Sequence, residues 1–332
     1  MPLPHSNKKG LLGMNMVMEM LPHLLLDGLT LGFVYALVAL GYTMVYGILE
    51  FINFAHSEIF MVGAFAGAEA LLFMQAKGIL GVMPAPVTLI IALLIGMIVS
   101  GLLGVAIERV AYKPIRNAPK LVPFISAIGV SFFLQDAVRL MEGVWKNAFY
   151  ITTPDIFKAK IKISDTLSIP VKSLFIMGIA VLIMFGLTVF ISGNKWGKAM
   201  RAVAQDRNTA ALMGINVSFV ISLTFAIGAG LGGATGTLFA VQYSLIHPYI
   251  GFILGMKAFT AAVFGGIGNI PGAMLGGILL GLLEVFGAAL LGIATNGAIG
   301  AEYKDVFAFV ILIFILILKP SGLLGKPAGE KV

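Results

Sequence analysis

Residues 28–48 read GLTLGFVYALVALGYTMVYGI, and none of these side chains carries a formal charge. A helix of about 20 apolar residues is long enough to cross the hydrocarbon core of a membrane. This segment therefore predicts a transmembrane helix. Similar stretches follow along the chain, and the expected spans are 24–48, 53–76, 87–108, 121–141, 172–192, 217–241, 252–268, 272–294 and 305–319.

The composition agrees with a chain that lies almost entirely in a membrane. Hydrophobic residues make up 59% of the 332 residues and charged residues only 11%, whereas soluble domains average about 25% charged residues. The sequence predicts an all-α polytopic integral membrane protein with eight or nine transmembrane helices in one domain, 1–332. Among the 41 glycines, pairs four residues apart, such as Gly28/Gly32 and Gly63/Gly67, predict close helix contacts.

The basic residues gather in short loops between the expected spans. One such loop is 109–120 and another is 193–216. Because Lys and Arg are retained on the cytoplasmic side, we expect both loops and the lysine-containing C-terminus to be cytoplasmic. The segment 143–170 is then an external loop, and 1–21 is an uncleaved N-terminal segment that lies partly at the interface. Three crossings before residue 109 place the N-terminus outside, unless a segment near 51–58 is re-entrant.

The loop 193–216 reads GNKWGKAMRAVAQDRNTAALMGIN and is strongly hydrophilic for this chain. It holds four basic residues and a single acid, Asp206. Its middle part, 200–212, is rich in Ala and predicts one short helix that Gly214 ends. A structured amphipathic helix in a short cytoplasmic loop indicates a docking element for a partner protein.

Polar residues inside the spans mark a second kind of site, because charged groups in a membrane usually face a cavity or a partner. Asn53, His56 and Glu58 follow the first span closely. They are interpreted as the lining or hinge of a substrate path. The alternative is a helix start at the interface, with Asn53 as the cap and Glu58 near the positive end of the helix dipole.

Four further charged residues carry structural interpretations. Glu108 and Arg109 end the third span and are expected to be interfacial anchors. Asp136 and Arg139 are spaced for an ion pair within one helix, and a structural role is favoured over a functional one.

Lys257 and Glu284 lie in neighbouring spans, and we expect them to pair, although contact with substrate is an alternative for either residue. The residues His247 and Pro248 interrupt the apolar stretch 236–266 much as His56 interrupts 42–67. This similarity indicates an internal repeat with broken helices, as found near the binding sites of many transporters, so His247 and Pro248 are also candidates for the translocation path or its hinge.

The sequence contains none of the common motifs that would indicate an enzyme. No GxxxxGK[ST] phosphate loop, GxSxG nucleophile motif or metal-ligand cluster is present, and the chain has no cysteine. The net charge of +7 comes from the basic loops, so nucleic acid is not an expected partner. The sequence leaves three classes open: a secondary transporter, a channel, or a permease driven by a separate ATPase.

Several stretches match one family in the same order along nearly the whole chain. They are GLTLGFVYALVALGYTMVYGI (28–48), INFAHSEIFMVGAF (52–65), ERVAYKPIR (108–116), FISAIGVSFFLQD (124–136), the basic loop 193–216, HPYIGFILGMKAFTAAVFGGIGNIPGAMLGG (247–277) and YKDVFAFVILIFILILKPSGLLG (303–325). The chain resembles the LivH-type permease subunits of ABC importers for branched-chain amino acids. It departs from the family where NFAHGE becomes NFAHSE, with Ser57 in place of glycine, so a special backbone conformation there is in doubt. The segment 143–170 lies outside the resemblance.

The resemblance implies a subunit of the plasma (cell inner) membrane that works with other chains. These are a second homologous permease, two cytoplasmic ATP-binding subunits and an extracytoplasmic substrate-binding protein. The ATPases hydrolyse ATP, so this chain needs no cofactor. The segment 201–215 corresponds to the coupling helix that docks on an ATPase, and the residues assigned to it are Arg201, Gln205, Asp206, Ala210, Ala211 and Gly214. Alternatives are a related importer for urea or short amides and a proton-coupled secondary transporter.

Overall fold

The computed structural model describes residues 5–119, 121–162, 168–295 and 303–325, and α-helices dominate these ranges. The α-helices are α1 (His5–Leu49), α2 (Ala55–Ala76), α3 (Ala85–Ile107), α4 (Leu121–Lys146), α5 (Val171–Gly193), α6 (Lys195–Gln205), α7 (Arg207–Leu212), α8 (Val217–Tyr243), α9 (Ile250–Gly265), α10 (Ile270–Ala294) and α11 (Lys304–Leu318). Short irregular turns of helix are η1 (Ile79–Gly81), η2 (Glu108–Tyr112) and η3 (Lys113–Ile115).

Seven helices in the described ranges are long and apolar enough to cross a membrane: α1, α2, α3, α4, α5, α8 and α10. The helix α9 is apolar but has only 16 residues, and α11 has 15. These nine helices overlap the nine predicted spans one by one, so the all-α polytopic fold is confirmed. The short length of α9 follows from Pro248 before it and Gly266, with a φ of 108°, after it.

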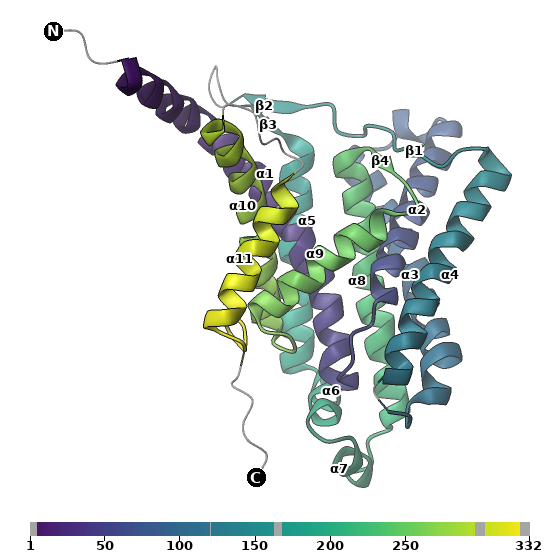
Figure 1. The fold of residues 1–332 in the computed structure, drawn as a ribbon. Helices are drawn as coiled ribbons and strands as arrows, with labels where there is room; N and C mark the ends of the chain where they lie inside the picture. Colours follow the sequence, from purple (N-terminus) through teal and green to yellow (C-terminus); the bar gives the residue numbers. More distant parts are fainter. Residues whose placement is uncertain (1–4, 120, 163–167, 296–302, 326–332) are drawn as a thin grey trace.

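The two ends of the molecule differ in the elements they carry. The first turns of α1 lie at one end, whereas α6 and α7 lie at the other (Figure 1). The helix α1 runs unbroken from His5 through Pro22 to Leu49, so the described part of the N-terminal segment, 5–21, continues into the first span. Of the two topologies left open above, the structure agrees with the one that has three crossings before residue 109, because the first turns of α1 lie opposite α6 and α7.

Glycine-to-glycine contacts hold the centre of the bundle together. A methyl group added at Gly63 of α2 collides with the backbone of Gly233 in α8, and one added at Gly96 of α3 lies 3.1 Å from the Gly233 carbonyl oxygen. On the other side of the bundle, Gly281 of α10 meets the backbone of Gly32 in α1 in the same way. The predicted contacts through small residues are therefore confirmed, and α2, α3 and α8 pack backbone to backbone.

Two small antiparallel sheets lie at the end opposite α6 and α7 (Figure 1). The strand β1 (Ile151–Thr152) pairs with β4 (Leu245–Ile246), and β2 (Lys160–Lys162) pairs with β3 (Ser168–Pro170). The pairing of β1 with β4 ties the loop after α4 to the loop after α8. The sequence did not predict these strands, because each has only two or three residues.

Candidate coupling and transport sites

The helix α6 lies flat against the bundle because only one of its faces is apolar. Its side facing the bundle carries the buried residues Gly197, Met200 and Val203, which recur every three residues. Asn194 caps its first turn by accepting a hydrogen bond from the Trp196 backbone N–H at 3.2 Å. Glycine is required at position 197, because a methyl group there would collide with the backbone of Ile191 at the end of α5.

The predicted single helix over 200–212 is wrong, because Asp206 divides it into α6 and α7. The Asp206 backbone is extended, with φ −156° and ψ 114°. Its carboxylate accepts hydrogen bonds from the Asn208 and Thr209 N–H groups at 2.8 and 3.1 Å and from the Thr209 hydroxyl at 2.8 Å. These bonds hold the pKa of Asp206 below its ordinary value. Asp206 thus starts a new helix instead of continuing the old one.

Gly214 ends α7, as predicted. It has a φ of 81°, which glycine adopts at no steric cost. The Gly214 N–H bonds the Ala211 carbonyl at 3.0 Å, and the Ile215 N–H bonds the Ala210 carbonyl at 3.1 Å. Asn216 then caps α8 by accepting from the Phe219 N–H at 3.0 Å. The chain therefore passes from α7 into α8 through two hydrogen-bonded turns.

Two arginines fasten the α6–α7 pair to the membrane helices. Arg201 donates to the carbonyls of Ile191 and Ser192 at the end of α5. Arg207 Nε donates to the Ile48 carbonyl at the end of α1 at 3.1 Å. Cations at helix C-termini also interact favourably with the helix dipole. Force on α6 or α7 therefore reaches α1, α5 and α8 directly.

The outer surface of the pair ends in an apolar tip. Leu212 is 88% exposed, and Met213 beside it is also exposed, whereas Ala210 is buried. Gln205 and Ala211 lie on the exposed side. The residues singled out from sequence did not include Leu212 and Met213. Two large apolar side chains in an otherwise hydrophilic loop were the signal that could have identified them.

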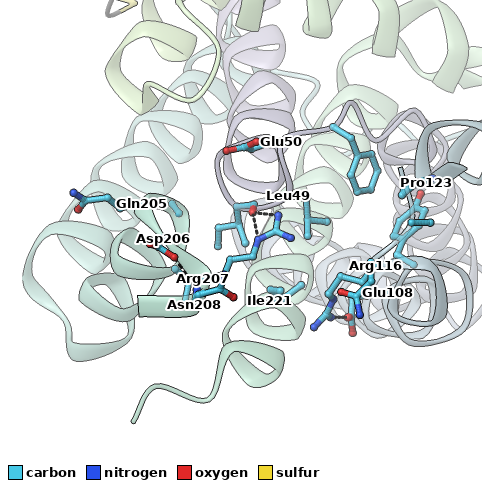
Figure 2. A pocket seen from close by; sticks show the side chains of 17 residues that line it. Leu49, Glu50, Glu108, Arg116, Pro123, Gln205, Asp206, Arg207, Asn208 and Ile221 are labelled. Atoms are coloured by element: carbon cyan, nitrogen blue, oxygen red, sulfur yellow. Dashed lines mark hydrogen bonds and ion pairs between the residues drawn. The ribbon is translucent and has the colours of Figure 1, made fainter. Parts of the chain in front are cut away.

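A cavity of about 540 Å³ opens between the α6–α7 pair, the end of α1 and the start of α4. Figure 2 shows Arg207 extending across it toward the end of α1, and Arg116 paired with Glu108 on the far wall. Glu108 also accepts from the Ser222 hydroxyl at 2.7 Å. Glu108 is fully buried, so its prediction as an interfacial anchor is wrong. Its neighbour Arg109 is exposed.

The residues Asn53, His56 and Glu58 are all buried at the start of α2. Asn53 does not cap α2, since the position before the helix is Phe54 and no side chain caps it. Instead Asn53 accepts a hydrogen bond from the Tyr112 hydroxyl at 2.6 Å, and Tyr112 lines the cavity. In the alternative of a helix start at the interface, the cap by Asn53 is therefore wrong, whereas Glu58 does lie in the first turn of α2.

His56 and Glu58 have different surroundings. The His56 ring fills a slot beside Gly41 of α1, where a methyl group would collide with it, and packs against Tyr42 with ring centres 4.8 Å apart. Glu58 Oε1 accepts from the Ser131 hydroxyl of α4 at 3.4 Å, while Glu58 Oε2 has no hydrogen-bond partner in the described ranges. A buried carboxylate oxygen without a partner is costly. Glu58 therefore has unused capacity to accept a hydrogen bond.

The predicted pair of Lys257 and Glu284 is confirmed and belongs to a larger network. Lys257 Nζ lies 2.9 Å from Glu284 Oε1 and 2.6 Å from Asp305 Oδ1. Lys304 Nζ lies 3.3 Å from the same Glu284 oxygen, and the Tyr35 hydroxyl donates to Glu284 Oε2 at 2.7 Å. The network joins α1, α9, α10 and α11, which fits a structural role in fixing their register.

His247 and Pro248 lie between β4 and α9, and β4 lies at the end of the molecule opposite α6 and α7 (Figure 1). The His247 ring lies 5.8 Å from that of Tyr150, and partial burial lowers the pKa of His247. The break before α9 and the break before α2 meet in the interior, because Gly251 of α9 faces Glu58 Oε2. The internal repeat stays a prediction.

Membrane-length helices, buried charged side chains and a helix pair hydrogen-bonded across one end characterise an integral membrane protein, and the family match that follows places it in the permease class. Residues 24–316 match the model of the family described as "Branched-chain amino acid transport system / permease component". The chain belongs to this family.

Curated relatives agree with the family assignment. The chain is 46% identical to the high-affinity branched-chain amino acid transport system permease protein BraD of Pseudomonas aeruginosa, over 93% of this chain and 97% of the relative. It is 44% identical to LivH of Escherichia coli, over 92% and 96%. A more distant relative, the fructose import permease FrcC of Rhizobium meliloti, is 23% identical over 63% of this chain and 58% of its own length.

Proposed function

We propose that this chain is the membrane permease subunit of an ABC importer for the branched-chain amino acids Leu, Ile and Val. It acts in the plasma membrane with a second homologous permease, two cytoplasmic ATP-binding subunits and an extracytoplasmic binding protein that delivers the substrate. ATP is hydrolysed by the ATP-binding subunits. This chain forms the path through which the amino acid crosses the membrane and catalyses no reaction itself. The names of the relatives at 44–46% identity support this substrate.

The construction of the α6–α7 pair is the observation that carries the proposal. Its apolar tip at Leu212 and Met213 is exposed, whereas its base is hydrogen-bonded to the ends of α1 and α5 through Arg207 and Arg201. A tip of this kind suits a hydrophobic groove on a partner. When the two ATPases close, the tips move together, and the arginine contacts pass that movement to the membrane helices.

The substrate path in this proposal runs beside the buried start of α2. Asn53 is hydrogen-bonded to Tyr112, which lines the cavity. Glu58 lies deeper, where it is bonded to Ser131 of α4 and faces Gly251 of α9. His56 acts as packing between α1 and α2 in this proposal. The network around Lys257 and Glu284 holds the helices behind the path and does not contact substrate.

The test of the proposal is co-purification of the ATP-binding subunits with variants of the tip. Leu212→Asp is expected to reduce recovery of the ATPase at least ten-fold, because a charge enters an apolar contact. Val82→Asp is a matched control, because Val82 is as exposed as Leu212, at 85%, but lies far from α7. Its neighbour Gly81 lines a cavity together with residues 154–156 and 158, between β1 and β2. Equal recovery with both variants contradicts a docking role for α7.

Uptake by purified components in liposomes separates the alternatives. The proposal expects leucine uptake only with ATP, the ATPases and the binding protein. Leucine uptake on a proton gradient without ATP indicates a proton-coupled secondary transporter. Uptake of urea or short amides in place of leucine, with the same ATP requirement, indicates the related importer.

A further inference from the structure

The helix α4 carries an ion pair in an unusual position. Arg139 Nε lies 3.7 Å from Asp136 Oδ1, and the two side chains are 50% and 66% exposed. Asp136 lies about 22 Å along the helix from Leu121, at ~1.5 Å per residue, while the hydrocarbon core is about 30 Å thick. Exposed charges at that depth are costly in lipid and usually face water or protein. The face of α4 that bears this pair is therefore unsuited to lipid.

An exposed aromatic side chain shares this face. Phe132, Asp136 and Arg139 are spaced as i, i+4 and i+7, and so lie above one another on one side of α4. Phe132 is 58% exposed. Its neighbour Phe133 is 70% exposed but points about 100° away around the helix. The face thus combines a positive group, a negative group and an aromatic surface within two turns.

Contacts with two other elements place the face beside the interior polar residues. Arg139 Nη1 donates to the Tyr249 hydroxyl at 3.0 Å, and Tyr249 directly precedes α9. About two turns back along the same helix, and about 80° around it from Arg139, Ser131 donates to Glu58, whose second oxygen is unpartnered in the described ranges. Polar groups on α4 therefore occur both at Arg139 and, about two turns away, at Ser131 beside Glu58; Asn53 is linked through Tyr112 to the cavity beside α7.

We infer that Phe132, Asp136 and Arg139 form an outer subsite for a zwitterionic aliphatic amino acid on its way to Glu58. The Arg139 guanidinium has N–H groups beyond the one bonded to Tyr249 and suits the α-carboxylate, which it can bind with two parallel hydrogen bonds. The Asp136 carboxylate suits the α-ammonium group. Phe132 offers an apolar surface to the side chain. The inference rests on the proposed function and adds the residues that recognise the substrate on this chain.

A purely structural role for the pair predicts different behaviour. An exposed ion pair within one helix adds little stability, so neutralising both partners leaves such a protein unchanged. A subsite loses its ligand contacts when either partner, or both, are neutralised. The double variant Asp136→Asn with Arg139→Gln therefore distinguishes the two roles.

Thiol labelling tests whether the face of α4 that carries Phe132 is accessible to water. The chain has no cysteine, so Phe132→Cys or Phe133→Cys introduces its only thiol. In the assembled importer in liposomes, a membrane-impermeant cationic methanethiosulfonate is expected to label position 132 at least ten-fold faster than position 133. Saturating leucine with the binding protein is expected to slow labelling at 132 alone. Equal rates at both positions, or no protection by leucine, overturn the inference.

Transport by the assembled importer supplies the second readout. At saturating leucine-loaded binding protein, Arg139→Gln and the double variant are each expected to transport leucine at least ten-fold more slowly than wild type, with basal ATP hydrolysis and ATPase recovery unchanged. Phe132→Ala is expected to fall several-fold and Phe133→Ala to match wild type. A double variant that transports normally assigns the pair a structural role and overturns the inference. Wild-type protein without ATP-dependent leucine transport overturns the proposed function instead.

Discussion

Removing Lys257 alone is expected to destabilise the folded chain more than removing Lys257 and the charge of Glu284 together. In the wild type, two lysines, Lys257 and Lys304, balance two carboxylates, Glu284 and Asp305. Lys257→Met keeps most of the side-chain volume but leaves a net negative charge around the fully buried Glu284. Lys257→Met with Glu284→Gln restores neutrality, because Lys304 and Asp305 still cancel.

The size of the effect follows from the contacts of Glu284. Losing one partner of a buried ion pair costs roughly 3–5 kcal/mol. Lys304 Nζ remains 3.3 Å from Glu284 Oε1, so we expect the lower end, about 3 kcal/mol. In the double variant the Tyr35 hydroxyl can still donate to the glutamine oxygen, and a loss of about 1 kcal/mol is expected. The difference of about 2 kcal/mol corresponds to a 30-fold change in the ratio of folded to unfolded protein, at about 1.4 kcal/mol per factor of ten.

The assay is an SDS titration of the purified chain in mixed micelles, with folding followed by tryptophan fluorescence. The order of midpoints is expected to be wild type, then the double variant, then Lys257→Met. A double variant as unstable as Lys257→Met refutes the reasoning, because the loss then arises from packing and not from an uncompensated charge.

Three further outcomes follow from the residues described above. Asp206→Ala is expected to destabilise α7 more than Asp206→Asn, and the measurement is faster amide exchange over 207–212. The pKa of Asp206 is lowered from 3.8 in the folded chain. The stability that the Asp206 carboxylate gives to α7 is therefore fully present above pH 3.8 and is lost as the pH falls through the lower folded pKa. Ala211→Pro breaks a hydrogen bond of α7 at a cost of about 3 kcal/mol and is expected to abolish leucine uptake without changing membrane insertion, whereas normal uptake rules out a helical coupling role. Gly41→Ala is expected to cost about 1–3 kcal/mol through collision with the His56 ring, and in the same SDS titration Gly41→Ala with His56→Ala should lose less than the sum of the single changes.

Features with a strong local signal could be predicted from the sequence. Apolar stretches of membrane length located the helices, and charges inside them identified Lys257 and Glu284 as partners. Gly214 was correctly placed at the end of α7 because a helix that runs into glycine commonly stops there. In each case a few neighbouring residues, or one rare residue type in an apolar context, carried the information.

Other features depend on how the chain folds back on itself. Glu108 looked interfacial because it ends an apolar span, but a π-turn and a 3-10 turn over 108–115 return Arg116 to it. Asp305 lies in the first turn of α11, and no local pattern in the sequence indicated its contact with Lys257 in α9. The break at Asp206 had a local signal, because aspartate is a preferred N-cap residue and can start a new helix. The alanines around it, however, favoured one continuous helix.

The glycine contacts among α2, α3 and α8 set the mechanical character of the molecule. Backbones that touch at Gly63, Gly96 and Gly233 have no layer of side chains between them that could repack. These three helices can therefore be displaced only as a single body. Since α7 leads into α8 through the turns at Gly214 and Asn216, a push on the tip acts on a stiff block rather than on one bendable helix. Deformation is then concentrated at the contacts around that block, which include those of α2 with α4 and α9 and of α8 with α1.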